Sequence, residues 1–492
     1  MTIHRRQFVV GPGPWREYPD WGVLQLPETG VLSFCPTLPV EIVADADGAT
    51  WALLGLALQT DPARPDPGAE IATTPTPLVP QLGIAWAGRW ALVGSGTVYP
   101  DAGALLGCYY WNQPANRRVA ACWVSSSAAM LGRTAMEYGS SESPHGLAHE
   151  RGLDWFPPPA SKFSAVRRLL PSQQLKIAGG RPEPRPWLPD PSARGSYDET
   201  LAEVGQQLVT SLRRLRLRAG AVAWVPLTAG FDSRLVLAAA LRAGLPVRTY
   251  TNYRRRMSLG DLKLPEQLAR AAGVAHEWHR PRRTLPDAER EYDEHSARET
   301  AGVDRTYFAR GQWDFARLGD CVLRGGCFEV GRCYYYRRFP AADGSTPPPA
   351  ATIAEGLHEP PDTPVTAALA EWTAAVDHSP VPALDWRDRL YLEQRLGGWL
   401  SAVEQSLDLA VPERIHVANA AATYALLLGL PEEVRASSRH QRDLIARLVP
   451  PLAEFPFNPP QEAFGRLSRL LYRFRRDPRA FLSSALARLR GR

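Results

Sequence analysis

The stretch from Ala221 to Gly244 constrains the fold more than any other part of the chain, because a strand pattern, a tight loop and a helix pattern follow one another in it. Its first seven residues, AVAWVPL, are apolar and suit a buried strand of a parallel sheet. From residue 234 the apolar residues recur at helical spacing until Gly244 ends the pattern. Between the two lies the loop TAGFDS at 228–233. We therefore predict a strand that enters a helix through this loop.

A loop of this kind has two interpretations. A tight strand-to-helix loop directs backbone N–H groups and the positive end of the helix dipole toward one point, and such a point binds phosphate. The other interpretation is an ordinary turn in which Asp232 or Ser233 caps the helix. The loop alone favours neither.

The residues around the loop indicate an α/β domain. A helical pattern that begins near residue 198 precedes the strand, and residues 246–252 form a second strand pattern followed by a helical pattern at 262–273. Strands that alternate with helices predict a parallel sheet. In open sheets of this type ligands bind beyond the carboxyl ends of the strands, which is where residues 228–233 would lie.

The chain of 492 residues is longer than one core usually supports, so we expect more than one domain. Residues 1–180 contain short strand patterns, 181–197 form a linker rich in proline and glycine, and 340–364 form a proline-rich loop.

No apolar run reaches the length of a membrane span and the first residues lack a signal-peptide pattern, so a cytoplasmic protein is expected. Cys321, Cys327 and Cys333 lack zinc-ligand spacing and are interpreted as packing thiols.

Positive charge is concentrated in the tail at 466–492. This segment holds nine arginines and one aspartate, a net charge of +8, whereas the whole chain carries +6. The rest of the chain is therefore slightly acidic, which argues against specific nucleic-acid binding. Leucine, phenylalanine and tyrosine alternate with the tail arginines, and Pro478 divides the segment into two short helical patterns. The apolar side either docks on the body, or the tail binds an anionic membrane surface or an acidic partner.

With the loop placed, a family resemblance emerges. TAGFDS at 228–233 resembles the pyrophosphate loop, Ser-Gly-Gly-x-Asp-Ser, of the asparagine synthetase family. The segments TYTNYRRRMSLGDLKLPEQLARAAGVAHEWH, VLRGGCFEVGR and VANAAATYALLLGLPEEVR resemble later parts of the family's synthetase domain, in the same order. Upstream, residues 88–131 are similar to its glutaminase-like domain. Relatives with an idle N-terminal domain include lasso-peptide macrolactam synthetases and β-lactam synthetases.

The resemblance implies an α/β protein with two domains and a tail. A glutaminase-like αββα domain of the Ntn type would span 1–180, and an adenine-nucleotide α-hydrolase-like (PP-loop) domain with a parallel sheet would span 198–465. It also implies a ligase that activates a carboxylate with ATP and Mg²⁺, releases pyrophosphate and lets an amine attack the acyl-adenylate. The substrate would be a small-molecule or peptide carboxylate from natural-product, peptide or glycan biosynthesis.

The same resemblance assigns site residues. Asp232 and Glu329 would hold Mg²⁺, and catalytic roles fall on Glu329, Arg439 and His440. The nucleotide contacts are expected at Thr228, Ala229, Gly230, Phe231, Asp232, Ser233, Thr251, Asp261 and Gly325. For Asp261, stabilisation of a helix N-terminus is an alternative to a nucleotide contact.

The chain departs from the family at three points. Position 2 is Thr2 where the family has a nucleophilic cysteine, and we expect the N-terminal domain to be structural or substrate-binding rather than a glutaminase. Gly326 stands where the family has a catalytic glutamate. The family's late lysine has no clear counterpart in RASSRHQRDLIARL, although Arg439, His440 and Arg442 lie there.

These departures leave two hypotheses. The first is an asparagine synthetase-like ligase that uses free ammonia or a substrate amine. The second is a catalytically degenerate nucleotide-binding scaffold that recruits a partner.

Arg254, Arg255 and Arg256 form either a solvated basic loop or a phosphate lid, and His276 and His279 are interpreted as structural.

Overall fold

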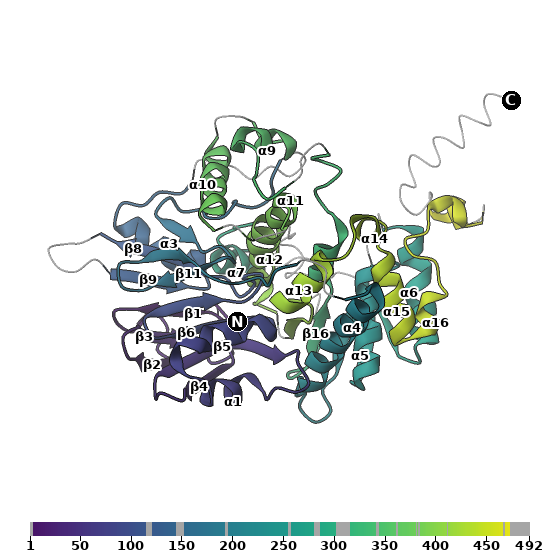
Figure 1. Cartoon of the computed structure of the whole chain (residues 1–492), viewed down its shortest axis with the longest axis horizontal. Coiled ribbons are helices and arrows are strands. Elements are labelled where there is room, and N and C mark those ends of the chain that lie inside the picture. The colour runs from purple at the N-terminus through teal and green to yellow at the C-terminus, as the bar shows by residue number, and fades with distance from the viewer. Residues whose placement is uncertain are drawn as a thin grey trace.

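The computed structural model describes residues 3–114, 121–143, 152–191, 195–253, 257–279, 286–301, 315–340, 344–360, 363–379, 381, 384–410, 412–465 and 468–472. Thr2, Arg254–Arg256 and most of the basic tail therefore lie outside the described residues. Antiparallel sheets of the N-terminal part lie on the left in Figure 1, and the helices around a parallel sheet lie on the right. The expected α/β fold class is confirmed.

Two six-stranded antiparallel sheets make up the N-terminal unit, residues 3–184. The first sheet has the order β10-β8-β9-β1-β3-β2 and contains β1 (Phe8–Gly11), β2 (Gly22–Leu26), β3 (Gly30–Phe34), β8 (Tyr109–Gln113), β9 (Ala121–Ser125) and β10 (Val166–Arg168). The second has the order β12-β11-β7-β6-β5-β4 and contains β4 (Val40–Ala44), β5 (Thr50–Gln59), β6 (Trp86–Gly94), β7 (Thr97–Pro100), β11 (Gln173–Lys176) and β12 (Arg181–Pro184). Strand β12 thus takes residues 181–184 of the expected linker.

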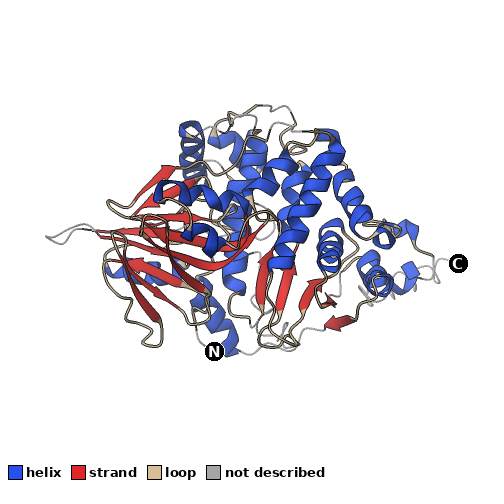
Figure 2. Ribbon diagram, turned by 60° about the horizontal axis from the view of Figure 1, so that its bottom comes forward, coloured by secondary structure: helices blue, strands red, loops and turns tan. Residues whose placement is uncertain are grey.

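Side chains alternate between the two faces of each sheet along the strands, and this alternation produces the layers of the unit. Val10 on β1 and Leu54 on β5 belong to one cluster, so the two sheets face each other across a shared core. On the outer face of the second sheet, Trp51 packs with residues around α1 (Pro67–Ala72) and α2 (Val79–Leu82). On the outer face of the first sheet, Trp111 packs with Leu131 of α3 (Ala128–Glu137). The result is the expected αββα layering, which Figure 2 shows from another side.

A five-stranded parallel sheet organises the C-terminal unit. Its order is β15-β14-β13-β16-β17, with β13 (Ala223–Pro226), β14 (Val247–Asn252), β15 (His276–His279), β16 (Cys321–Arg324) and β17 (Glu413–His416). Three helices accompany the first strands: α4 (Tyr197–Arg214), α5 (Phe231–Ala243) and α6 (Leu259–Ala271). Because β13 pairs with β14 on one side and with β16 on the other, the strand order reverses beside β13. This reversal is where open α/β sheets bind ligands.

The remaining described segments are mostly helical. They contain α7 (Pro286–Ser296), α9 (Ala350–Gly356), α10 (Pro364–His378), α11 (Trp386–Leu390), the π-helix η4 (Tyr391–Leu400), α12 (Ser401–Leu407), α13 (Ala421–Leu428), α14 (Glu432–Ala436), α15 (Arg439–Leu448) and α16 (Pro450–Ala453), with the 3₁₀ segment η3 (Gly326–Arg332) between α7 and α9. The expectation of a loop throughout 340–364 is wrong, because α9 forms after Pro349 and buries Ile353 and Ala354. The three cysteines interpreted as packing thiols are buried and free.

Within the described residues, no helix combines the length and the hydropathy that a bilayer crossing requires. Of the tail, residues 468–472 are described as helical, with Leu470 and Leu471 exposed and Tyr472 buried.

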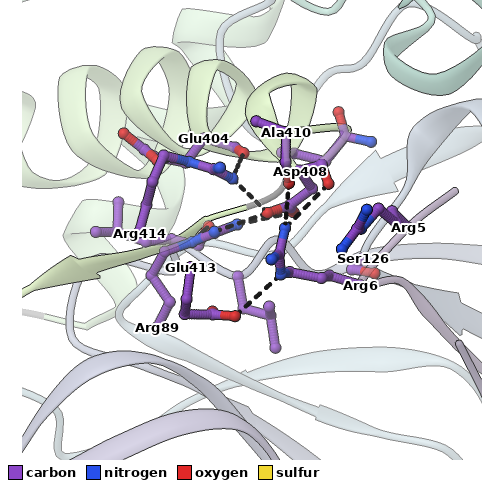
Figure 3. Close-up of polar contacts among 12 residues, drawn as sticks. Arg5, Arg6, Arg89, Ser126, Glu404, Asp408, Ala410, Glu413 and Arg414 are labelled. Atoms are coloured by element: carbon purple, nitrogen blue, oxygen red, sulfur yellow. Dashed lines mark hydrogen bonds and ion pairs between the residues drawn. The ribbon is translucent and has the colours of Figure 1, made fainter. Parts of the chain in front are cut away.

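A buried network of charges joins the two units (Figure 3). Arg89 of β6 donates to both carboxylate oxygens of Asp408, at 3.0 and 3.1 Å. Arg6, just before β1, donates to the carbonyl oxygens of Asp408 and Ala410. Arg414 of β17 pairs with Asp408 as well. Because the Asp408 side chain is fully buried, these arginines hold its pKa below the ordinary value against the opposing effect of burial.

Candidate functional site

The loop at 228–233 joins the central strand β13 to α5. The N-cap residue of α5 is Gly230, in an extended conformation, and no side-chain hydrogen bond caps the helix. Neither Asp232 nor Ser233 is the N-cap, so the capping interpretation is wrong. The first-turn N–H groups and the positive end of a 13-residue helix therefore converge at the carboxyl edge of the sheet. This arrangement suits a phosphate group.

Hydrogen bonds within the loop fix its shape. The Ser233 hydroxyl accepts the N–H of Thr228 at 3.1 Å and lies 2.9 Å from the Thr228 hydroxyl. The Gly230 N–H donates to Thr228 Oγ1 at 3.2 Å. Thr228 itself remains exposed. The loop is thus held in one shape while its outer side stays open to a ligand.

Two further residues expected to contact nucleotide hold the loop from behind. Asp261 accepts the Ala229 N–H at 2.9 Å, and its other oxygen accepts the hydroxyl of Ser258, the N-cap of α6. Thr251 is buried and donates to the Leu227 carbonyl at 2.6 Å. Within the described part of the chain, both residues act as supports of the loop and of the end of β13.

The segment after β16 lies against the loop. A Cβ atom on Gly325 would lie 3.0 Å from backbone atoms of Asp232, closer than most side-chain contacts, so glycine favours this approach. A Cβ atom on Gly326 would point toward Leu400 at 3.4 Å and His416 at 4.0 Å. The position of the family's catalytic glutamate therefore faces a leucine and a buried histidine.

The two carboxylates expected to bind metal converge on one guanidinium. Arg332 Nη1 lies 3.3 Å from Asp232 and 3.8 Å from Glu329. Gln441 of α15 donates to the other oxygen of Asp232 at 2.8 Å. Desolvation raises the pKa of Asp232 to about 6, with Arg332 opposing the shift and Glu329 adding to it. The structure thus brings Asp232 and Glu329 together, with Arg332 beside both.

Tyr391 adds a donor from η4. Its hydroxyl donates to Glu329 at 3.0 Å. Burial, and then the negative charge of Glu329, raise the pKa of Tyr391 well above its ordinary value. The phenol therefore stays protonated at neutral pH and fixes the orientation of the Glu329 carboxylate.

The other two residues expected to be catalytic lie apart from this cluster. Arg439 is exposed, pairs with Asp443 at 3.4 Å and lies over the ring of Tyr197. His440 is buried, and burial lowers its pKa to about 4. Its Nδ1 faces the Val434 carbonyl, and its Nε2 lies next to Gly331. Among the described residues, no contact joins Arg439 or His440 to Asp232 or Glu329.

A segment from the end of the C-terminal unit covers one side of the loop. Phe457 stacks on Phe231 with ring centroids 4.3 Å apart, and Cζ of Arg234 lies 3.9 Å from the centroid of the Phe457 ring. The Asn458 N–H donates to the Ala229 carbonyl at 3.0 Å. This segment packs against the start of α5. The Asp232 side chain instead contacts Arg332 and Gln441.

Sequence reasoning missed Arg332, Gln441 and Tyr391. Arg332 follows Glu329 by three residues, a spacing that brings side chains together on a helical turn and could have been recognised. Gln441 adjoins Arg439 and His440, but helix phase and not adjacency decides which side chain faces the loop. For Tyr391 the sequence offers no signal, because its contact depends on how η4 packs.

The histidines at the two ends of β15 contact neighbouring side chains. His276 bonds Thr249, and His279 stacks on Phe315 with ring centroids 3.8 Å apart. The described residues contain no group of three or more His, Cys, Asp or Glu side chains placed to hold a metal ion. A magnesium site formed by two carboxylates and phosphate oxygens needs no third protein ligand, so the expected pair remains compatible with Mg²⁺.

Three comparisons with known proteins give one distant structural match. No protein-family model matches the chain, and no curated protein matches it. Among solved structures, it is similar to glutamine-dependent NAD+ synthetase from Acinetobacter baumannii in complex with adenosine diphosphate, at 16% identity and a TM-score of 0.20. That match covers 51% of this chain and 48% of the synthetase, so it spans about half of each. At this score the likeness carries no argument about activity, and membership of the asparagine synthetase family stays a prediction.

Proposed function

We propose that the protein is an ATP-dependent ligase that forms an amide bond and releases AMP and pyrophosphate. A carboxylate oxygen of the substrate attacks the α-phosphorus of ATP, and the bond to pyrophosphate breaks. Ammonia or an amine then attacks the carbonyl carbon of the acyl-adenylate, AMP leaves, and the amine nitrogen loses a proton. This is the asparagine synthetase-like chemistry that the sequence resemblance implies.

One observation carries the proposal. The uncapped first turn of α5 lies at the reversal of strand order, and its loop is held by Ser233, Asp261 and Thr251 while Thr228 stays exposed. A ready-made set of N–H donors at this edge suits the pyrophosphate of ATP. These backbone donors are already fixed in place, so they need not reorganise when the phosphates bind.

The charged side chains have separate roles in this proposal. Asp232 and Glu329 would hold Mg²⁺ together with phosphate oxygens, and the ion would neutralise charge that develops on the departing pyrophosphate. Arg332 would turn from the two carboxylates to the phosphates, because a guanidinium binds phosphate oxygens in pairs. Tyr391 would keep Glu329 aimed at the site through its 3.0 Å hydrogen bond.

The residue at position 326 determines which nucleophile we propose. Gly326 supplies no carboxylate, and its Cα faces Leu400. We therefore assign no general base to this position and expect the attacking nitrogen to enter uncharged. The nucleophile is then free ammonia or an amine of the substrate, in line with an N-terminal unit that is not a glutaminase.

A second candidate function is a nucleotide-binding scaffold without ligase activity. The position of Arg332 favours it, since its guanidinium lies where a metal ion between Asp232 and Glu329 would need to be. In that case the ion pair is permanent and the loop binds nucleotide without turnover.

Two measurements on the same samples distinguish these functions. Calorimetry should show that the protein binds Mg·ATP, and that Asp232→Ala weakens binding tenfold or more, about 1.4 kcal/mol for one lost carboxylate contact. Asp287→Ala is the matched control, because Asp287 forms an exposed pair with Arg290 on α7. Pyrophosphate release is then measured with ammonium and a panel of carboxylic acids. Binding without release supports the scaffold, and absence of Mg·ATP binding in the parent protein contradicts both functions.

A further inference from the structure

The guanidinium of Arg395 lies among aromatic rings at the boundary between the two units. Its Cζ is 3.7 Å from the ring centroid of Trp399, 5.5 Å from that of Trp155 and 5.7 Å from that of Tyr334. Arg395 and Trp399 belong to η4, whereas Trp155 comes from the N-terminal unit. Such a setting holds the guanidinium plane in a fixed orientation through cation–π contacts.

The positive charge of Arg395 has no acidic partner among the described residues. No carboxylate there lies within 4.0 Å of it, and its Nε is buried without a hydrogen-bond partner. The nearby Asp154 accepts instead from the indole N–H of Trp399 at 3.2 Å. Each fully buried arginine in the described part of the chain has a hydrogen-bond acceptor, as Arg414 has in Glu404 at 2.8 Å and Arg168 in the Gly398 carbonyl at 2.8 Å. A buried donor without an acceptor requires an explanation, and a bound molecule that supplies the acceptor is one.

A second unpartnered donor lies beside the first. The indole nitrogen of Trp155 is buried and has no hydrogen-bond partner in the described part of the molecule, and Trp155 is only 4% exposed. Tyr334, in contrast, is 45% exposed, so the ring cluster reaches the surface on that side. The cluster therefore combines unused N–H donors with one ring, that of Tyr334, which reaches solvent.

Direct contacts connect this cluster with the candidate site. The ring of Tyr334 lies 5.1 Å from that of Tyr391, whose hydroxyl donates to Glu329. Glu329 in turn lies beside Arg332 and the phosphate loop. Arg395 is one turn further along η4 than Tyr391. A molecule that extends from the loop toward Arg395 would pass the exposed ring of Tyr334, because Tyr391 is only 3% exposed.

We propose that Arg395 binds a carboxylate at the end of the substrate that is not activated, so that the substrate is a dicarboxylic acid with an apolar chain or ring between its two carboxylates. The flat fork of a guanidinium matches a carboxylate in bidentate fashion, and the flanking rings match an apolar spacer. The role of this molecule as substrate rests on the proposed ligase function, whereas its binding at Arg395 does not.

Binding is measured by calorimetry without ATP, using α,ω-dicarboxylates from succinate to suberate and the monocarboxylate of equal carbon number for each. We expect at least one diacid to bind ten times or more tightly than its matched monoacid. Arg395→Gln should remove that preference, and Arg395→Lys should keep part of it, because lysine retains the charge and loses the fork. Arg270→Gln, an exposed arginine on α6, is the matched control and should bind like the parent protein.

The outcomes separate the two proposals. If no diacid is preferred over its monoacid, or if both Arg395 variants bind like the parent protein, the carboxylate site is wrong. If Arg395→Gln does not fold, the Arg395→Lys variant decides, since unchanged affinity for the diacid overturns the assignment. Mg·ATP binding is measured on the same proteins. If diacids bind at Arg395 and ATP does not bind, the ligase function is contradicted and the carboxylate site is supported. If ATP binds and no diacid is preferred, the carboxylate site is contradicted and the ligase function is not.

Discussion

Replacing Asp232 by asparagine should make the protein more stable and its nucleotide binding weaker. Desolvation raises the pKa of Asp232 from 3.8 to about 6, even though Arg332 opposes the shift. A raised carboxyl pKa means that the folded protein binds a proton more tightly than the unfolded chain does. The ionised carboxylate therefore destabilises the native state at neutral pH. Asparagine keeps the shape of the side chain and carries no charge.

The magnitude follows from the size of the pKa change. About two pH units at 1.36 kcal/mol each correspond to about 3 kcal/mol. Because a quarter of the Asp232 side chain stays exposed, water lowers this cost, and we expect a gain of about 1–3 kcal/mol at pH 7.5. The gain should be complete above pH 6, shrink as the pH falls toward 4, and vanish below that, where the carboxyl group is protonated in both states.

Urea unfolding followed by tryptophan fluorescence between pH 4 and 8 measures the effect. Asp287→Asn, in an exposed pair on α7, serves as the control and should change stability little at any pH. Mg·ATP affinity of Asp232→Asn should fall tenfold or more, about 1.4 kcal/mol. The reasoning is refuted if the variant is less stable than the parent protein at pH 7.5, or if its gain is the same at pH 4 and pH 7.5.

Four further predictions concern other parts of the chain. Asp408→Ala should lower the free energy of unfolding by about 3–5 kcal/mol, since it leaves the buried Arg89 without its carboxylate partner and Arg414 with Glu404 alone, whereas Asp287→Ala should cost less than about 1 kcal/mol in the same urea titration. Asp261→Ala should weaken Mg·ATP binding by about 1–3 kcal/mol in calorimetry, because the Ala229 N–H loses its acceptor. Thr2→Ala should leave glutamine-independent pyrophosphate release unchanged, and ammonia release from glutamine that disappears in this variant would contradict the prediction. Deleting residues 466–492 should abolish salt-sensitive binding to acidic vesicles, to which each arginine contributes about 1 kcal/mol. The deletion should leave the melting temperature nearly unchanged. A large fall in melting temperature would show that the tail packs on the body.

The sequence predicts the strand, loop and helix at 221–244 well because neighbouring residues decide them. The apolar run, the small residues of the loop and Gly244 place β13, the loop and α5 within about three residues of their observed bounds. Gly244 ends α5 in the left-handed conformation that glycine adopts without strain. The αββα layering and the parallel sheet were expected from the family resemblance and from the alternation of patterns.

The side chains that complete the candidate site could not be predicted in the same way. Asp232, Arg332, Tyr391 and Gln441 come from four separate elements, and only packing brings them together. The π-helical winding of η4 also decides which residues of 391–400 face the cluster, and a pattern based on 3.6 residues per turn does not reveal it. For α9, the proline content of 340–364 concealed a short helix that tertiary burial of Ile353 stabilises.

The charge network around Asp408 sets an order of events during synthesis of the chain. Arg6 and Arg89 emerge from the ribosome 402 and 319 residues before Asp408. At about 5–20 residues per second, Arg89 waits roughly 16–64 seconds for its partner. Until then a guanidinium that the finished protein buries stays in contact with water. The N-terminal sheets can form early, but their face toward the C-terminal unit closes only when α12 and β17 have been made, so the last stage of folding awaits the last fifth of the chain.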